Sequence, residues 1–471
     1  MAATPDAVSR SGGRALTRPS RSTLVVAVLL AAIVIAGGAL RLNAAAHPVG
    51  EASADQKAYL RIAHDIRSRG TYGDGQLHQP FHWAPGAPAL FAFADAVAGT
   101  PARGPLDLEA ARRAEAIVGT LTVLAAFALA ALLAGRWAGL AAAAAAASYP
   151  PLIDASRVLV SEPLGALAIT VALALLVWAW QRGGPARFAV AGLAFGFACL
   201  VRADLLLASL VVPVVAGALI WRRHDLRAAA GSTAAMLAAT LLVTGAWSWH
   251  ASTVSGHFVP VTDGGAATLY IATYLPGHGT INGMKESLRP ELNRAHPRLR
   301  HVPTWRIPAQ TYIALVSKHR HPHLTVESAL RREVLRNLRV YGLGHPLSFA
   351  SMVLDKFWRM WGSYYHGARH GVIVWKLWWH RALVALALAG ALLGLWRSRS
   401  AALGLVLLAI AITTAVDVGF VAEPRHAFRL LPGLFAAGAA GWAMVLPGPL
   451  SRLRPSAAEG ATTQPASRSA G

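Results

Sequence analysis

Long apolar runs, separated by short basic segments, recur along most of the chain. The first run, 24–40, follows a segment that carries Arg10, Arg14, Arg18 and Arg21. Many runs approach the ~18 to 20 apolar residues that an α-helix needs to cross a bilayer. Further runs lie at about 112–134, 138–152, 163–180, 188–201, 204–221, 228–249, 381–396, 401–421 and 427–447. The pattern predicts an all-α, multi-pass membrane protein with about ten spans.

The distribution of arginine sets the predicted topology. If the spans alternate, the short loops on the side of the N-terminus are all basic, as cytoplasmic loops generally are. These loops contain Arg136, Arg182, Arg187, Arg222, Arg223, Arg227, Arg397, Arg399, Arg452 and Arg454. The first run is about 17 residues, longer than the apolar part of a signal peptide, so we expect a retained helix although residues 44–46 imitate a cleavage site. The excess of Arg over Lys is typical of GC-rich bacterial genomes, and we expect a bacterial plasma membrane.

Composition supports this class and changes the interpretation of the charge. Of 471 residues, 55% are hydrophobic and 14% are charged, against about 25% charged in a typical soluble domain. A net charge of +22 would indicate nucleic acid in a soluble chain. Here topology is the first explanation, and we expect no nucleic-acid partner. Cys199 is the one cysteine, which excludes an intrachain disulfide.

The spans divide the chain into five predicted parts. These are a cytoplasmic basic N-terminus (1–22), a transmembrane catalytic core with a first outer loop at 43–111 (23–250), an extracytoplasmic or interfacial region (251–380), C-terminal spans (381–447) and a disordered cytoplasmic tail (448–471).

Both outer segments contain helical patterns. The first holds a helix at 54–69, then turn formers, then an apolar stretch of about twelve residues at 87–98 that suits an interfacial or re-entrant piece. In the second, an apolar stripe from Val326 stops at Gly342, and Pro346 opens another helix. Tryptophans precede the next span, as expected at the headgroup level; they are Trp375, Trp378 and Trp379.

Acids in the outer connections are not explained by topology. Asp55 begins the first outer helix, where capping is the ordinary reason for an acid and a carboxylate that takes a proton or holds a metal is the alternative. Glu162 precedes Pro163 at a span mouth, where the helix dipole favours an acid. Arg157 is a candidate partner for Glu162, and Asp154 lies in the same connection.

Arginines in the predicted outer connections are exceptions to the preference of basic residues for cytoplasmic loops. Arg202 either forms a simple ion pair with Asp204 at a tight bend or binds an anion, and Arg425 raises the same question. Asp417 lies about two turns inside a span, where an unpaired charge costs about 2.5 to 3.5 kcal/mol, so we expect it to have a partner or to be protonated. Two more basic residues follow Arg425: His426 and Arg429.

Other familiar sites are poorly supported. Eleven of the 18 histidines lie between 257 and 380, but no pair has metal-binding spacing on a predicted helix. The 16 Lys and Arg against 6 Asp and Glu between 251 and 380 favour anionic lipid or an anionic acceptor. Nucleotide-binding glycine loops and the zinc-protease motif are absent from the sequence. An enzyme on the outer face therefore needs an activated group carried by a membrane lipid.

Several short motifs together resemble the GT-C membrane glycosyltransferases. The closest group is the protein O-mannosyltransferase and aminoarabinose transferase superfamily, called glycosyltransferase family 39. The motifs are Asp55-Gln56-x-x-Tyr59, Gly70-x-Tyr72, Pro85-x-x-Pro88, Ser161-Glu162-Pro163-Leu164, Gly192 to Arg202, Gly256-His257-Phe258-Val259-Pro260, Leu269-Tyr270-Ile271 and Glu423-Pro424-Arg425-His426.

The resemblance implies a GT-C helix bundle that moves a sugar from a polyprenyl phosphate to a hydroxyl of protein, lipid or glycan, with inversion. It implies Asp55 as base or acceptor-positioning acid and Glu162 as a second acid that positions acceptor or metal. It implies Arg202 and Arg425 as ligands of the donor phosphate. Supporting residues are Tyr59, Asp154, Arg157, His82, Tyr270 and His426.

The chain departs from the family at two places, and other functions compete. Gln56 stands where many relatives carry a second acid, so dependence on a divalent metal such as Mg²⁺ or Mn²⁺ stays open. Trp83 and Ala84 precede the prolines where some relatives have a lysine, and His78 or His82 is the candidate substitute. The alternatives are a transporter or flippase of lipid-linked glycan, and a scaffold or sensor without catalysis.

Overall fold

A computed structural model describes residues 20–49, 53–72, 80–223, 225–363 and 374–446, and these residues form helices and loops without a strand. The predicted N-terminal segment and C-terminal tail, like His78, therefore lie outside the described residues, apart from 20–22. Each predicted span corresponds to a helix: α1 (Arg21–Ala46), α4 (Leu108–Ala134), α5 (Arg136–Ser148), α7 (Glu162–Arg182), α8 (Pro185–Val201), α9 (Leu206–Trp221), α10 (Leu226–Ser255), α17 (Val374–Ser398), α18 (Ala401–Gly419) and α20 (Leu431–Val445).

Seven helices in the described part of the chain are long and apolar enough to cross a membrane. The prediction of ten spans is not confirmed, because α5, α8 and α20 have 13, 17 and 15 residues. All three pack inside the bundle against longer helices: α5 and α20 against α4, and α8 against α7 and α10. The chain is a multi-pass, all-α membrane protein.

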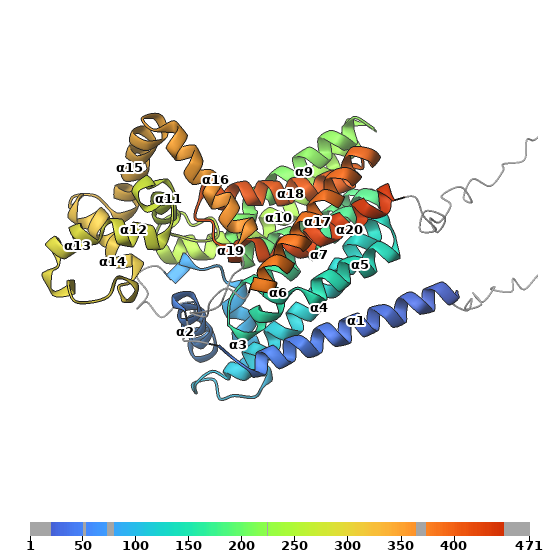
Figure 1. Ribbon diagram of the computed structural model, residues 1–471, viewed down its shortest axis with the longest axis horizontal. Coiled ribbons are helices and arrows are strands. Elements are labelled where there is room, and N and C mark those ends of the chain that lie inside the picture. The colour runs from blue at the N-terminus through green and yellow to red at the C-terminus, as the bar shows by residue number, and fades with distance from the viewer. Residues whose placement is uncertain (1–19, 50–52, 73–79, 224, 364–373, 447–471) are drawn as a thin grey trace, which may run out of the picture.

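The bundle has two distinct ends (Figure 1). The start of α1 and the end of α20 lie together at one end, and α2, α3 and α11–α16 gather at the other, called here the distal end. Arg136 donates hydrogen bonds to Ser22 (2.8 Å) and Thr23 (3.0 Å). The first of the predicted cytoplasmic arginines therefore lies beside the start of α1, as the predicted topology requires.

Small residues bring the spans close together. A Cβ on Gly441 of α20 would lie 1.9 Å from the carbonyl oxygen of Gly390 in α17, and one on Gly192 of α8 would lie 2.2 Å from that of Met236 in α10. Close backbone approach of this kind is how membrane helices gain van der Waals contact where lipid offers no hydrophobic driving force. These crossings set the relative heights of the helices that carry the charged residues.

Local sequence explains the two helices that precede α4. The Ser53 hydroxyl accepts a hydrogen bond from the Gln56 amide (3.2 Å) and caps α2 (Ala54–Arg69), which ends at Gly70 with φ of 67°. Glycine adopts this left-handed conformation without steric cost. The apolar stretch predicted to be too short to span is α3 (Gly86–Val97), a 12-residue helix that packs against α2 and α4.

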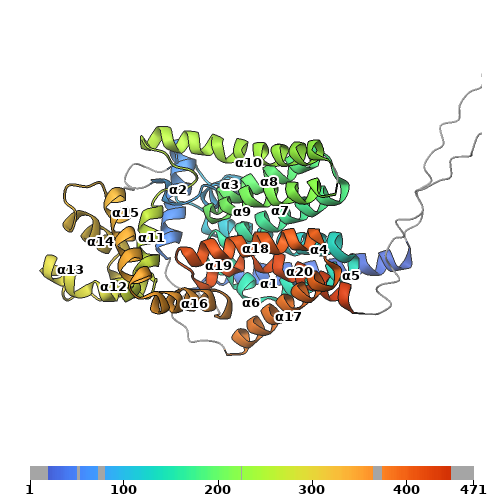
Figure 2. The same cartoon turned by 90° about the horizontal axis from the view of Figure 1, so that it is seen from above.

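The second outer segment forms helices that stand at the distal end (Figure 2). The predicted stripe from Val326 is α15 (Val326–Asn337), continued by a π-helical turn, η8 (Leu338–Leu343), and Pro346 begins α16 (Pro346–Gly362), so both predicted helices are confirmed. The others are α11 (Gly265–Thr273), α12 (Ile281–Ser287), α13 (Arg289–Ala295) and α14 (Ala309–Ala314).

A buried acid ties these helices together. Glu333 of α15 accepts hydrogen bonds from Arg320 (3.2 Å) and His321 (2.8 Å), and Arg320 also donates to Glu291 of α13 (2.9 Å). Burial would raise the pKa of Glu333, but the hydrogen bond with His321 and the charges of Arg320 and Arg336 outweigh it and lower that pKa.

The lowered pKa predicts that this region loses stability in acid. Because the folded pKa of Glu333 lies below the unfolded value of about 4.3, its stabilisation is complete above the unfolded value and is lost as pH falls through the lower, folded pKa. Glu333→Gln should make the distal helices more sensitive to limited proteolysis at neutral pH, and the difference from wild type should shrink as the medium is acidified below the unfolded pKa. Glu327→Gln, which removes the exposed pair with Arg331, is the control and should change little. A difference that persists unchanged in acid would contradict this account.

Candidate active site

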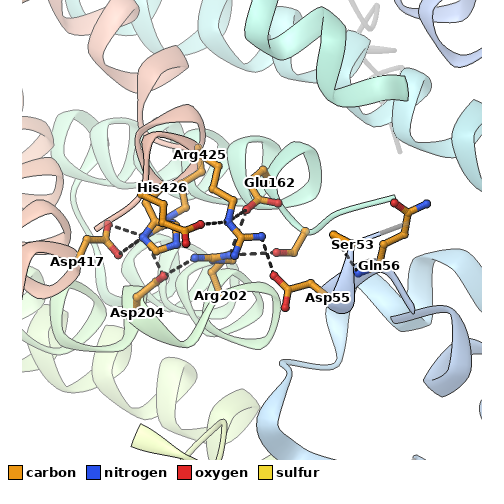
Figure 3. A network of polar contacts seen from close by, with 12 residues as sticks. Ser53, Asp55, Gln56, Glu162, Arg202, Asp204, Asp417, Arg425 and His426 are labelled. Carbon is orange, nitrogen blue, oxygen red and sulfur yellow. Dashed lines mark hydrogen bonds and ion pairs between the residues drawn. The ribbon is translucent and has the colours of Figure 1, made fainter. Parts of the chain in front are cut away.

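Asp55 and Arg425, 370 residues apart in sequence, meet at the distal mouth of the bundle (Figure 3). Arg425 lies in α19 (Pro424–Phe428), a short helix between α18 and α20, and its Nη1 is 2.7 Å from Asp55 Oδ2. The Trp83 indole donates to Asp55 Oδ1 at 3.4 Å. Burial would raise the pKa of Asp55, but the charge and hydrogen bond of Arg425 and the hydrogen bond of Trp83 together lower it. Asp55 is therefore ionised at neutral pH.

Glu162 lies between two guanidinium groups. It is the first residue of α7, its side chain is 3% exposed, and its Oε1 is 3.6 Å from Arg202 Nη1 and 3.7 Å from Arg425 Nε. Neither carboxylate oxygen has a hydrogen-bond partner within the described residues. The carboxylate thus has attracting charges on both sides and unused acceptor capacity.

Arg202 joins the first outer helix to the core. It lies at the bend between α8 and the 3₁₀ turn η3 (Ala203–Leu205), and donates to Asp204 (2.8 Å) and to the Ser161 hydroxyl (3.1 Å). The same hydroxyl accepts a hydrogen bond from Tyr59 of α2 (3.2 Å). Burial would lower the pKa of Arg202, but Asp204 and Glu162 raise it, so the guanidinium stays charged.

The network continues inward through Arg429. This fully buried side chain donates two hydrogen bonds to Asp417 of α18 (2.8 and 2.7 Å) and lies 2.9 Å from Asp204. The partner expected for Asp417 is therefore Arg429. Gly165 of α7 leaves the necessary space, since a Cβ there would lie 3.1 Å from Arg202 and 3.7 Å from Arg429.

Comparison with known proteins shows what this arrangement resembles. Residues 87–249 match the family model of dolichyl-phosphate-mannose-protein mannosyltransferases. The oligosaccharyltransferase AglB from Archaeoglobus fulgidus, solved with an inhibitory peptide and a dolichol-phosphate, superimposes with a TM-score of 0.51 at 14% identity, over 89% of this chain and 50% of that one. The apo oligosaccharyltransferase of the same organism gives 0.53 at 16% identity, over 88% and 50%.

The chain has the GT-C fold. The resemblance predicted from the sequence is confirmed, and the chain spans about half the length of the archaeal oligosaccharyltransferases that it matches. ArnT from Cupriavidus metallidurans bound to undecaprenyl phosphate is also similar, with a TM-score of 0.40 at 16% identity, over 90% of this chain and 77% of that one. A comparison with curated protein sequences gives no match. The matched family segment includes Glu162 and Arg202 but neither Asp55 nor Arg425.

Within the GT-C fold, the four residues predicted at the centre of the site come together: Asp55, Glu162, Arg202 and Arg425. Among the supporting residues, Tyr59 and His426 join them. The Tyr59 hydroxyl contacts Ser161, and His426 Nδ1 lies 3.8 Å from Asp417. His82 is adjacent, with its ring against that of Trp83 (4.7 Å between centroids).

The structure places the remaining predicted site residues outside this network. Arg157 is not the partner of Glu162, because its side chain pairs with Asp154 (3.4 Å) and donates to the His47 carbonyl (3.3 Å). Asp154 also binds Lys376 of α17 (2.7 Å), so that connection ties α6 (Pro150–Asp154) to a distant span. Tyr270 is buried among the apolar side chains of α11–α15 and stacks on Tyr274.

The acids do not fit a metal ion shared by Asp55 and Glu162. Arg425 contacts both carboxylates, through Nη1 and Nε, so a positive charge already lies between them. Within the described ranges no three His, Cys, Asp or Glu side chains gather as metal ligands would. The departure at Gln56 is consistent with this geometry.

Sequence reasoning missed Glu115 of α4. It is fully buried, neither of its carboxylate oxygens has a hydrogen-bond partner among the described residues, and its electrostatic neighbour is Glu162. An acid inside the run predicted as a span, 112–134, is the signal that could have identified it.

Proposed function

We propose that this protein is a membrane glycosyltransferase that moves a sugar from a polyprenyl-phosphate donor to a hydroxyl of a protein, lipid or glycan acceptor. The observation that carries the proposal is the meeting of Asp55, Glu162, Arg202 and Arg425 from four distant segments in one network. Two arginines and two acids supply the charges that both sides of such a transfer need. The GT-C fold supports it.

The arginines suit the leaving group. When the glycosidic bond breaks, the negative charge of the donor phosphate grows, and guanidinium groups stabilise it through charge-assisted, bidentate hydrogen bonds. Arg202 and Arg425 flank Glu162 at 3.6 and 3.7 Å, so a phosphate could replace part of these contacts without new charges being brought in.

The acids suit the acceptor. The attacking hydroxyl must lose a proton as its oxygen bonds to the anomeric carbon, and an ionised carboxylate within hydrogen-bonding reach can accept that proton. Asp55, whose side chain is 30% exposed, is our choice for this role, with Glu162 positioning the acceptor. A single displacement inverts the anomeric centre.

The predicted topology supports an extracytoplasmic site for the reaction. The arginine-rich short loops of the predicted cytoplasmic face lie opposite the network, which is at the distal end with α2 and α19. We infer a bacterial plasma-membrane enzyme whose activated sugar arrives on a lipid that has already crossed the bilayer.

A reconstitution assay tests the proposal. Purified protein in liposomes is supplied with radiolabelled undecaprenyl-phosphate sugars and an extract of cell-envelope acceptors, with and without a chelator. We expect a labelled product with a new glycosidic bond, largely lost in Asp55→Asn and kept in Glu109→Gln, a variant of an exposed acid that pairs with Arg113. Labelled donor that changes leaflet without forming a bond would identify a flippase. If neither transfer nor a change of leaflet is observed, the scaffold without catalysis becomes the better interpretation.

The donor arginines give a quantitative prediction. Replacing Arg202 or Arg425 by glutamine should raise KM for the polyprenyl-phosphate sugar by about 10- to 100-fold, since a hydrogen bond to a charged group contributes about 1.5 to 3 kcal/mol. Initial rates over a range of donor concentrations measure this effect. Arg113→Gln is the matched control and should leave KM unchanged. A KM unaffected in both site variants would contradict donor binding by these arginines.

A further inference from the structure

Helices α15 and α16 form a hairpin whose turn exposes large apolar side chains. In the hairpin, defined as residues 326–362, Leu343 is 80% exposed and Leu347 is 86% exposed. Six more apolar residues of the hairpin are at least two-fifths exposed: Leu335, Leu338, Val340, Leu354, Phe357 and Trp358. Contiguous apolar surface of this kind marks an interaction site in a folded protein.

The base of the hairpin contacts the beginning of a candidate membrane span. The Gly362 carbonyl, at the end of α16, accepts a hydrogen bond from Arg381 Nε (2.9 Å), and the Trp361 carbonyl accepts one from His380 Nε2 (2.8 Å). His380 and Arg381 lie in the second turn of α17, a helix long and apolar enough to span. The hairpin therefore starts beside the first turns of a span and leads away from it (Figures 1 and 2).

Aromatic side chains mark the same level. The guanidinium of Arg381 lies over the rings of Trp358 of α16 (5.8 Å) and Trp378 of α17 (5.5 Å). Trp358, Trp375 and Trp378 are each 62% exposed. Tryptophan is enriched where a bilayer meets water, so the apolar stripe of α16 continues the lipid-facing surface of α17 outward.

The positive charge of α15, the first helix of the hairpin, indicates what the hairpin binds. Arg331, Arg332, Arg336 and Arg339 are exposed along α15 and η8, beside Leu335 and Leu338. Two of them have acidic partners: Arg331 pairs with Glu327 and Arg336 with Glu333. Arg332 and Arg339 form no ion pair within the described ranges. Exposed leucines interleaved with arginines fit the boundary between acyl chains and anionic headgroups better than a purely apolar protein surface.

We propose that the α15–α16 hairpin docks into the bilayer leaflet at the distal end, with its apolar stripe at the acyl boundary and Arg332 and Arg339 on anionic lipid phosphates. Docking would hold the distal helices at a fixed height above the mouth of the bundle. The proposal stands whether or not the protein transfers sugar, because it depends on the surface and not on the network.

A depth measurement tests the proposal on the full chain. The single natural cysteine, Cys199, is fully buried, so Leu347→Cys can be labelled selectively with an environment-sensitive fluorophore after reconstitution. Brominated lipids should quench this label at least about twofold more than a label at Arg298→Cys, an exposed position of the same region. Equal quenching at the two positions would overturn the proposal.

The lipid composition separates the two parts of the proposal. Quenching at Leu347→Cys should be stronger in vesicles that contain phosphatidylglycerol than in pure phosphatidylcholine, and Arg332→Gln with Arg339→Gln should remove that difference. A difference that survives the double substitution would overturn the assignment of the arginines. Disulfide-linked dimers of unlabelled Leu347→Cys, formed without quenching of the labelled protein, would show that a second copy covers this surface instead.

Discussion

Asp55→Asn is expected to reduce kcat for sugar transfer by about 10²- to 10⁴-fold, the usual contribution of a general base. Asparagine keeps the size of the side chain and can still accept from Trp83, which lies 3.4 Å away, but it cannot take a proton at neutral pH. Because Arg425 would lose one of its acidic partners and keep Glu423 at 2.8 Å, a small change in KM for the donor is also expected. Single-turnover kinetics with labelled donor separate the chemical step from binding.

Two comparisons decide whether this loss is chemical. Asp55→Glu should recover part of the rate, since it restores the proton acceptor at a shifted position. Glu327→Gln should behave as wild type, because Glu327 is an exposed residue of α15 whose ion pair is with Arg331 and not with the network. If Asp55→Asn keeps more than half of the wild-type kcat, Asp55 is not the base, and Glu162 becomes the first acid to replace.

Arg429→Met is expected to destabilise the protein by about 3 to 5 kcal/mol. The side chain is fully buried and contacts Asp417 and Asp204 at 2.7 and 2.9 Å. Its removal leaves the buried Asp417 carboxylate without its guanidinium partner, whereas Asp204 keeps Arg202 at 2.8 Å. Methionine fills much of the volume, so the loss reports charge more than cavity formation. Equilibrium unfolding in detergent micelles measures the change.

Removal of the unpaired charge should reverse the effect. Adding Asp417→Asn to Arg429→Met should recover more than half of the lost stability, because breaking a buried ion pair is worse than replacing it entirely. Arg113→Met, an exposed arginine paired with Glu109, is the control and should cost less than about 1 kcal/mol. A double variant no more stable than Arg429→Met would contradict the electrostatic explanation.

The two predictions concern opposite ends of one network, so the effect on catalysis and the effect on stability should occur in different variants. Asp55, on α2, lies at the exposed end of the network, where its replacement affects catalysis with little change in packing. Arg429 lies at the buried end between α18 and α20, where replacement acts on stability first. A variant such as Glu162→Gln, in contact with arginines from both sides, should show both effects to a smaller degree.

The sequence by itself determined the class of the protein, the positions of its helices and most of the unusual charges, although not Glu115. Apolar length, caps such as Ser53, helix stops such as Gly70 and acids in outer connections are local properties, so they can be recognised without knowing what packs against them. The same local signals indicated that Asp417 needs a partner. They overestimated the number of spans, because short helices such as α5 are stabilised by neighbours that the pattern does not show.

Only the tertiary structure decided which charges meet. Arg157 is five residues from Glu162 and was the obvious partner, yet Glu162 lies near Arg202 and Arg425, and Arg429 serves both Asp417 and Asp204. These pairings depend on how closely the helices approach, as at Gly165 of α7, where a Cβ would lie 3.1 Å from Arg202 and 3.7 Å from Arg429. A shift of one helical turn, about 5.4 Å, exceeds the length of any of these contacts and alters no local pattern, and for that reason no local pattern could have predicted them.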